Sequence, residues 1–310
     1  MIKEFLDQNY KDFTLTVASS DASFRKYYRL QKDSQSYLIM DSSLEKESLK
    51  PFLDVTKQLL EVGVSVPEIY KEDLQNGYLL IEDFGSMDLL QKLNETNFQK
   101  LYTQAINVIV KMQNADTKGL PEYDKAFLHF EMDLMQEWYL EKKLQKKLSD
   151  KEEKVLQNAL ETISTIVLQQ PQNIFVHRDY HSRNIMIKDD GSLGIIDYQD
   201  AMSGAITYDL VSLLKDCYIT FDRDEILKLV LYFRDKVSPQ TTDAEFIKWF
   251  DFMGMQRHIK VLGVFSRLHL RDAKDGYLKD IPLTLHYLLD TAQRYEETQE
   301  LAHLLSKYTA

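Results

Sequence analysis

Apolar and polar residues alternate over much of the first 85 positions. Phe13, Leu15 and Val17 alternate with polar residues, a pattern typical of a half-buried β-strand. Stretches rich in tyrosine and aliphatic residues predict further strands, and Asn76-Gly77 is a hairpin signal between the last two. The five predicted strands span residues 13–17, 24–30, 36–40, 64–70 and 78–82.

A segment with helical spacing separates the third and fourth predicted strands. Apolar residues recur there every three or four positions from Leu49 to Leu60. Ser42-x-x-Glu45 has the form of a capping box, in which each side chain meets a backbone N–H at the helix start. Gly63 is well placed as the C-terminal cap. The N-terminal part therefore combines a five-stranded antiparallel sheet with one main helix.

Helical periodicity dominates from about residue 88 onward, interrupted by a strand-rich stretch at about residues 174–199. This change of character predicts an α+β protein with two lobes. We expect the sheet lobe to cover residues 1–85 and the mostly helical lobe to cover residues 86–310.

The strand-rich stretch carries the candidate chemistry. It begins Ile174-Phe-Val-His-Arg-Asp-Tyr-His-Ser-Arg-Asn-Ile-Met-Ile-Lys188, which contains the spacing H-x-D-x-x-x-x-N through Asp179 and Asn184. Asp190-Gly191 then predicts a hairpin turn, and the returning strand ends at Asp197. We expect the three polar side chains to lie at neighbouring strand ends and to face one cleft.

Phosphoryl transfer needs this set of groups. A carboxylate must orient the acceptor hydroxyl and take its proton, and Asp179 is the candidate for this catalytic role. One amide oxygen and one carboxylate hold Mg²⁺ on the phosphates, so Asn184 and Asp197 are the candidate metal ligands. His181 is a second catalytic candidate that would donate to the γ-phosphate. The alternative without catalysis is a structural hairpin whose polar residues only cap turns.

The motif resembles known kinase sequences. Protein kinases share H-R-D and the later metal aspartate, but here Tyr-Gln follows Asp197, and no Ala-Pro-Glu segment appears. Gly204-Ala-Ile-Thr-Tyr-Asp-Leu-Val211 is similar to the aminoglycoside and choline phosphotransferase group, where Asp209 would tie the catalytic loop to the next helix. The resemblance implies a protein-kinase-like fold, ATP and Mg²⁺ as cofactors, and a small-molecule acceptor.

Longer strings narrow the resemblance. Phe-Val-His-Arg-Asp-Tyr-His-Ser-Arg-Asn, Asp21-Ala-Ser-Phe-Arg25 and Glu137-Trp-Tyr-Leu140 look like the bacterial N-acetylmuramate/N-acetylglucosamine anomeric kinases of cell-wall recycling. That family phosphorylates the anomeric hydroxyl of an N-acetylated amino sugar. Two alternatives stay open: another small-molecule kinase acting on an aminoglycoside, choline, homoserine or another sugar, and a pseudokinase that only binds nucleotide.

The N-terminal lobe departs from the kinase pattern at the residues that bind the phosphates of ATP. The third strand holds Met40, or Asp41, where kinases place a lysine, and the turn at residues 19–23 contains no glycine. A basic residue on the neighbouring strand would replace the lysine, with Glu45 or Glu47 as its acidic partner. The residues expected to contact the nucleotide are Ser20, Ser23, Arg25, Lys26 (or Arg29), Glu82 at the hinge, and Asn184.

The acceptor pocket has the weakest sequence signal. Glu137 and Trp138 lie on a predicted helix, where an aromatic ring and a carboxylate would suit a sugar. One of Arg257, Arg267 and Arg271, with Arg257 as the candidate chosen, would pair with the lactyl carboxylate of N-acetylmuramate. Asp200 would touch the acceptor or brace the loop. The ordinary alternatives are a core tryptophan and ion-paired surface charges.

Composition narrows the possible binding partners and the cellular location of the protein. The 310 residues carry 38 Lys and Arg against 49 Asp and Glu, a net charge of −11, which argues against nucleic-acid or anionic-membrane partners. The one cysteine, Cys217, cannot form an internal disulfide, and we find no signal peptide or membrane span. We therefore expect a cytoplasmic protein, and the sequence indicates no protein partner.

Overall fold

The described chain folds into two compact units. The computed structural model describes residues 2–6, 10, 12–20 and 25–309. Unit 1 comprises Met1–Lys92 and Arg183–Ala201, and unit 2 comprises Leu93–Ser182 and Met202–Ala310. Among the described helices, none combines the length and the apolar character needed to cross a membrane. A sheet-based unit and a mostly helical unit confirm the α+β class.

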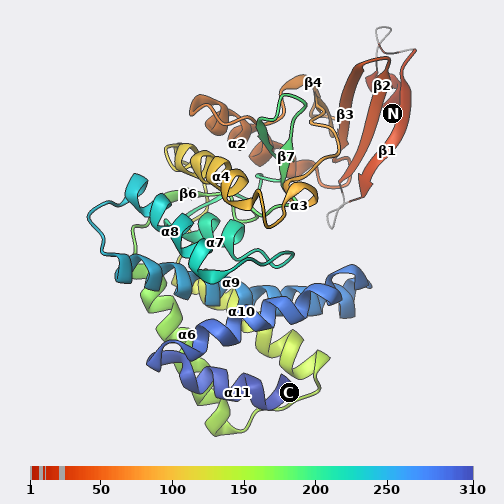
Figure 1. Cartoon of the computed structure of the whole chain (residues 1–310). Helices are drawn as coiled ribbons and strands as arrows, with labels where there is room; N and C mark the ends of the chain where they lie inside the picture. The colour runs from red at the N-terminus through yellow and green to blue at the C-terminus, as the bar shows by residue number, and fades with distance from the viewer. Residues whose placement is uncertain (1, 7–9, 11, 21–24, 310) are drawn as a thin grey trace. The chain divides into compact units, whose positions relative to one another are not determined.

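Unit 1 is built on a five-stranded antiparallel sheet in the order β1-β2-β3-β5-β4 (Figure 1). The predicted strands are all present, although the fourth begins later than its apolar pattern suggested. Their bounds are β1 (Thr14–Ser20), β2 (Lys26–Lys32), β3 (Gln35–Asp41), β4 (Ile69–Asp73) and β5 (Tyr78–Glu82). The hairpin turn at Asn76-Gly77 is confirmed, because Gly77 has a φ of 87° and joins β4 to β5.

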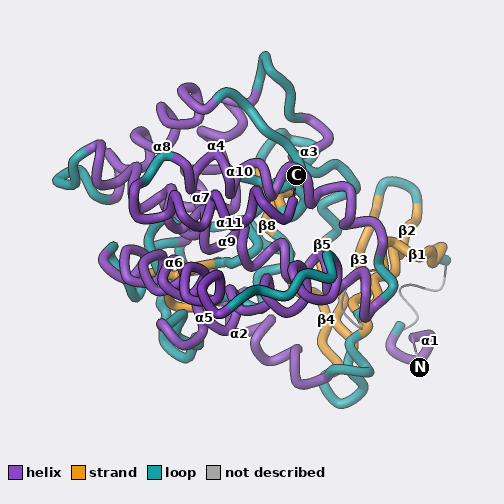
Figure 2. The backbone as a smooth tube through the Cα atoms, turned by 90° about the horizontal axis from the view of Figure 1, so that it is seen from below, coloured by secondary structure: helices purple, strands orange, loops and turns teal. Residues whose placement is uncertain are grey.

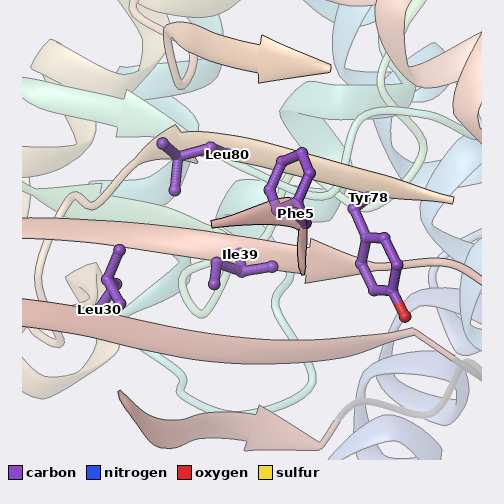
Figure 3. Close-up of a cluster of buried hydrophobic side chains, with 5 residues drawn as sticks. All are labelled: Phe5, Leu30, Ile39, Tyr78 and Leu80. Carbon is purple, nitrogen blue, oxygen red and sulfur yellow. The ribbon is translucent and has the colours of Figure 1, made fainter. Parts of the chain in front are cut away.

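One face of this sheet carries a small apolar cluster. Leu30, Ile39, Tyr78 and Leu80 project from β2, β3 and β5, and Phe5 of the short helix α1 (Ile2–Phe5) lies against them (Figure 3). All five side chains are buried, so α1 covers part of the sheet.

The exposure of β1 differs from its alternating pattern. Leu15 is 41% exposed and Val17 is 72% exposed, so the prediction that they face a core is wrong. β1 pairs only with β2 and forms an edge of the sheet. Alternation shows that two residues share a face, but it does not show that the face is covered.

Helix α2 (Leu49–Glu61) is the predicted main helix, but it begins differently from the prediction. A 3₁₀ turn, Lys46–Ser48, precedes it, and the Ser42 hydroxyl lies buried without a hydrogen-bond partner. The capping-box prediction is therefore wrong. The C-terminal cap is confirmed, because Gly63 has a φ of 73° and the Val64 N–H donates to the carbonyl of Leu59 at 3.0 Å.

The predicted catalytic hairpin also belongs to unit 1. It consists of β7 (Ile185–Ile187) and β8 (Leu193–Ile195). The Ile187 N–H donates to Met87 and the Ile195 N–H donates to Ser65, each at 2.8 Å. The expected boundary after residue 85 placed this hairpin in the second lobe, whereas these backbone contacts group residues 183–201 with the sheet.

Unit 2 is mostly helical (Figure 2). Its longest helix, α9 (Asp243–Asp272), is buried along its middle and packs against the segments before and after it in sequence. A short pair of strands, β6 (Ile174–Val176) and β9 (Met202–Gly204), frames the catalytic loop. The other α-helices are α4 (Phe98–Met112), α5 (Lys125–Leu134), α6 (Asp150–Gln169), α7 (Tyr208–Leu214), α8 (Arg223–Val237), α10 (Ile281–Gln293) and α11 (Gln299–Thr309). The π-helix η3 (Met135–Lys143) and the 3₁₀ helices η4 (Asp275–Asp280) and η5 (Glu296–Thr298) complete the described elements of unit 2.

Candidate active site

A buried carboxylate holds the start of the catalytic loop in unit 2. Asp209, at the start of α7, accepts backbone N–H bonds from His177 at 2.8 Å and from Arg178 at 3.1 Å. Arg178 has a φ of 75°, an uncommon conformation that such bonds fix in place. Burial raises the pKa of Asp209 to about 6. The expected structural role of Asp209 is thus seen directly.

A second buried carboxylate, which the sequence analysis did not single out, holds the end of the same loop. Asp216 accepts from the Ser182 N–H at 2.9 Å, from the Ser182 hydroxyl, and from the Tyr218 N–H at 3.1 Å. The two carboxylates therefore hold the loop on either side of Asp179, Asp209 at residues 177–178 and Asp216 at Ser182. The available signal was weak, because Asp216 directly follows Lys215 and reads as an ordinary charged pair.

Asp179 itself lies at the surface of unit 2 beside buried cations. Its side chain is 43% exposed, and its Oδ1 lies 3.9 Å from a terminal nitrogen of Arg257 on α9. Partial burial raises the pKa of Asp179, but the charges of Lys260 and Arg257 outweigh it and hold that pKa well below the ordinary value. Asp179 is therefore ionised across the physiological pH range, ready to orient a hydroxyl.

Lys260 belongs to a buried polar network under the loop. Its ammonium lies 3.1 Å from Glu131 Oε1 and donates to the Tyr208 hydroxyl at 3.1 Å. Arg178 donates to the same Glu131 oxygen at 2.6 Å. Glu131 thus joins α5, the catalytic loop and α9 through charged hydrogen bonds. Glu131 and Lys260 were missed because they are far apart in sequence and belong to no motif.

His181 follows Asp179 within the loop. Its N–H donates to the Asp179 carbonyl at 2.9 Å, and its ring meets the Tyr218 ring edge-on, with centroids 5.3 Å apart. The ring is therefore held in position by packing. Its expected contact with a γ-phosphate stays a prediction.

The two candidate metal ligands meet in unit 1. The Asn184 side-chain amide donates to Asp197 Oδ2 at 3.2 Å, and Gln199 donates to Asp197 Oδ1 at 2.8 Å. Asp197 has a φ of 66°, in the left-handed region that a non-glycine residue adopts at some cost. In the described chain no group of three or more His, Cys, Asp or Glu side chains could hold a metal. The donor set fits Mg²⁺, which needs only one or two protein ligands besides phosphates and water.

A cavity of about 310 Å³ lies next to this pair, wholly within unit 1. Its walls are mainly apolar, and Asn184 and Asp197 line one part of it. The segment after β5 lines another part through Glu82, Phe84 and Gly85, as expected of a hinge. Lys188 pairs with Glu82 at 2.9 Å. The remaining lining residues are Ala18, Tyr27, Arg29, Leu38, Phe52, Pro67, Ile81, Ser86, Met186, Ile196 and Tyr198.

The candidate phosphate cations differ in their surroundings. Met40 is buried and shares a strand face with the cavity-lining Leu38, so it occupies the place expected for lysine. Arg25 is buried, and its Nε lies 2.8 Å from Glu45 Oε1. Lys26 is exposed and is not among the cavity-lining residues.

Arg29 lines the cavity, but Asp83 holds it through two hydrogen bonds of 2.6 and 2.9 Å. Among the candidates, Arg25 therefore has the pairing expected of a phosphate-binding cation. Two further nucleotide candidates have no side-chain account: Ser23 lies outside the described residues, and for Ser20 the structure describes only the backbone of β1.

The acceptor candidates other than Arg257 contact near sequence neighbours. Lys142 pairs with Glu137 at 2.5 Å and lies 3.5 Å from the centre of the Trp138 ring. Asp200, in unit 1, accepts from Gln199 at 3.4 Å. The roles of Glu137, Trp138 and Asp200 in acceptor binding stay predictions. The convergence of Asp179 with the metal pair also stays a prediction, because these groups belong to different units.

Comparisons with known proteins match most of the chain. Residues 14–236 match the model of the phosphotransferase enzyme family. The N-acetylmuramate/N-acetylglucosamine kinase of Neisseria meningitidis serogroup B is 38% identical, with 98% of this chain and 94% of that protein covered. The kinase of the same name from Pseudomonas aeruginosa is 36% identical, with 94% and 88% covered.

Solved structures share the fold at low sequence identity. An ADP-bound aminoglycoside phosphotransferase has a TM-score of 0.64 at 15% identity, covering 94% of this chain and 98% of its own. An ethanolamine kinase from Plasmodium vivax has a TM-score of 0.66 at 12% identity, covering 92% and 84%. The protein-kinase-like fold expected from the catalytic motif is thereby confirmed.

Proposed function

The chain belongs to the phosphotransferase enzyme family, and from that premise we propose that it transfers the γ-phosphate of ATP to the anomeric hydroxyl of N-acetylmuramate or N-acetylglucosamine. The observation that carries the choice of acceptor is similarity along nearly the whole chain to kinases that bear the names of these two sugars. The product would be a sugar 1-phosphate, suited to the recycling of cell-wall sugars in the cytoplasm, where ATP is available.

Asp179 would act directly on the acceptor. Its carboxylate accepts a hydrogen bond from the anomeric hydroxyl and aligns that oxygen with the γ-phosphorus. The oxygen forms its bond to phosphorus as the bond to the bridging β,γ-oxygen breaks, ADP leaves, and the hydroxyl proton passes to Asp179. Because its pKa is depressed, Asp179 is a weak base, so orientation is its larger contribution and proton transfer comes late.

Asn184 and Asp197 would hold Mg²⁺ through their amide and carboxylate oxygens, and the bound ion would offset charge on the phosphates. The cavity in unit 1 suits the adenine of ATP, because apolar side chains surround it and the backbone after Glu82 supplies N–H and C=O groups. His181 would donate to the γ-phosphate from its packed position against Tyr218.

Arg25 would replace the missing lysine. Arg25 directly precedes β2, in which Tyr27 and Arg29 share a strand face and line the cavity. Glu45 pairs with Arg25 in the way that a helix glutamate pairs with the phosphate-binding lysine of other kinases. An arginine keeps its charge at all relevant pH values and binds phosphate oxygens through a planar fork.

ADP release with Mg-ATP tests this proposal across N-acetylmuramate, N-acetylglucosamine, glucose, choline, homoserine and kanamycin. We expect turnover on the two N-acetylated sugars and a loss of at least about 1,000-fold in Asp179→Ala. Turnover on another acceptor alone would overturn the amino-sugar assignment and keep the phosphotransferase reaction. ATP binding without turnover on any acceptor would favour the pseudokinase alternative.

A further inference from the structure

Arg257 is a buried cation close to the candidate catalytic carboxylate, Asp179. The residue is 5% exposed, yet its terminal nitrogen lies 3.9 Å from Asp179 Oδ1, and the Asp179 side chain is 43% exposed. Its guanidinium carbon lies 5.9 Å from the centre of the Tyr208 ring. The Arg257 guanidinium therefore lies next to the carboxylate at which an acceptor hydroxyl would bind.

Hydrogen bonding distinguishes Arg257 from the other cations of this cluster. Lys260 bonds to Tyr208 and Glu131, and Arg178 bonds to Glu131. Arg257 donates no hydrogen bond within the chain as far as the structure describes it, and its contact with Asp179 is longer than a hydrogen bond.

A buried guanidinium in this state calls for a partner. It carries five N–H donors, and none of its nitrogens is among the fully buried side-chain atoms of the described chain that lack a partner, so these donors are open to a ligand. Its charge persists: burial lowers the pKa of Arg257, but Tyr208 and Asp179 raise it, and the net pKa lies above the ordinary value. An anion with two coplanar oxygens is the chemical group that fits such a fork.

We propose that Arg257 recognises a carboxylate carried by the acceptor, so that the site prefers an acidic amino sugar to its neutral counterpart. The inference rests on the proposed function, because it takes the acceptor to be N-acetylmuramate or N-acetylglucosamine. Of these two sugars, only N-acetylmuramate bears a carboxylate. Arg257 is then a specificity-determining residue, and the neutral sugar binds without meeting its donors.

The competing role for Arg257 is to position Asp179. A positioning residue would affect every acceptor alike and would act mainly on kcat, because Asp179 meets the hydroxyl of each sugar. A carboxylate-binding residue changes the ratio between acceptors and acts mainly on KM for the acid. The selectivity ratio, kcat/KM for N-acetylmuramate divided by kcat/KM for N-acetylglucosamine, separates the two roles and does not depend on the fraction of active enzyme.

The test compares this ratio in the wild type, Arg257→Gln, Arg257→Lys and the control Arg271→Gln, whose side chain is exposed on the same helix and pairs with Asp272. We expect the ratio to fall about 10- to 100-fold in Arg257→Gln, and less in Arg257→Lys, which keeps the charge without the fork. The control ratio should match the wild type. A ratio within threefold of the wild type in Arg257→Gln would overturn the inference and leave the proposed function standing.

A second measurement needs no variant. The wild-type protein is assayed on N-acetylmuramate and on its methyl ester, which has lost the negative charge. We expect kcat/KM for the methyl ester to be at least about tenfold lower than kcat/KM for the acid. Equal values of kcat/KM for the acid and the ester would overturn the inference. A wild-type protein that turns over neither N-acetylated sugar would overturn the proposed function and the inference together.

Discussion

Gly263 on α9 lets this helix approach the backbone of a neighbouring segment. A Cβ added at Gly263 would lie 2.4 Å from the carbonyl carbon of Leu134 and 2.6 Å from its oxygen. Ordinary contacts of a Cβ begin near 3.4 Å, so in Gly263→Ala the two backbones must separate by about 1 Å. Because the obstacle is backbone, a change of side-chain rotamer cannot relieve it.

Two opposing effects set the magnitude for Gly263→Ala. Alanine in a helix interior is favoured over glycine by about 1 kcal/mol, whereas overpacking against a rigid neighbour costs about 1–3 kcal/mol or more. Since the contact lies about 1 Å inside the normal limit, we expect overpacking to dominate, with a net loss of about 2 kcal/mol. In a unit of about 200 residues this corresponds to a fall in Tm of roughly 4–8 °C.

The same displacement would reach the catalytic loop. Lys260 lies one turn before Gly263, and its ammonium lies 3.1 Å from Glu131 of α5. Separating α9 from the end of α5 lengthens that pair and shifts the cations beside Asp179. Well below the Tm we expect kcat to fall by about tenfold or more, because misplacement of about 1 Å at a reacting group has effects of this size.

Thermal unfolding followed by circular dichroism, together with steady-state ADP release at 20 °C, measures both consequences of Gly263→Ala. The matched control is Gly276→Ala, because a Cβ at Gly276 meets nothing within 4 Å. The control should stay within about 1 kcal/mol of the wild type. A Tm of Gly263→Ala equal to or above the wild-type value would refute the reasoning, because helix propensity would then outweigh the clash.

Three further predictions concern the proposed phosphate-binding cation Arg25, the carboxylate Asp216 that holds the catalytic loop, and the buried His258. Arg25→Met should raise KM for ATP by about tenfold or more, whereas Lys26→Met should change that KM less than threefold, as measured by steady-state kinetics. Equal effects of the two substitutions would refute the assignment of Arg25 as the phosphate-binding cation. Asp216→Ala leaves the Ser182 donors unmet and should lower kcat by about 10- to 100-fold at unchanged KM for ATP; wild-type kcat in a folded variant would contradict this role of Asp216. Burial and neighbouring cations lower the pKa of His258 to about 3, so its neutral form stabilises the fold above pH 6.5, and this stability is lost as the pH falls towards 3. Urea unfolding between pH 4 and 6 should show a slope shallower by about 1.4 kcal/mol per pH unit in His258→Gln than in the wild type, and parallel slopes would contradict a neutral buried histidine.

Local patterns in the sequence correctly predicted the strands, the turns and the C-terminal helix cap whose formation depends on neighbouring residues. The strands of the sheet, the turns at Gly77 and Gly191 and the cap at Gly63 depend on neighbouring residues, and all appear in the structure. The spacing of Asn184 and Asp197 across a short hairpin likewise predicted that these two side chains meet. Long-range pairings were not accessible in this way, because no periodicity links α5 to α9.

Glu131 shows what a single sequence lacks. It is an acidic residue on a helix, the most ordinary of surface patterns, yet it is buried and accepts from Arg178 and Lys260. Its burial requires partners from two other segments, and each partner also has an ordinary surface reading. Only the packing of α9 along unit 2 identifies the three as one network.

Glu45 shows how a local motif can mislead and still mark a functional residue. Its spacing from Ser42 fits a capping box, but its carboxylate lies against Arg25, and α2 begins only at Leu49. A glutamate cannot serve both partners, and the pairing with a buried arginine is the stronger of the two because the charge of Arg25 needs compensation. The capping-box spacing therefore fails because Glu45 pairs with Arg25, the residue directly before β2. That Arg25 takes the place of the lysine missing at Met40 stays a proposal.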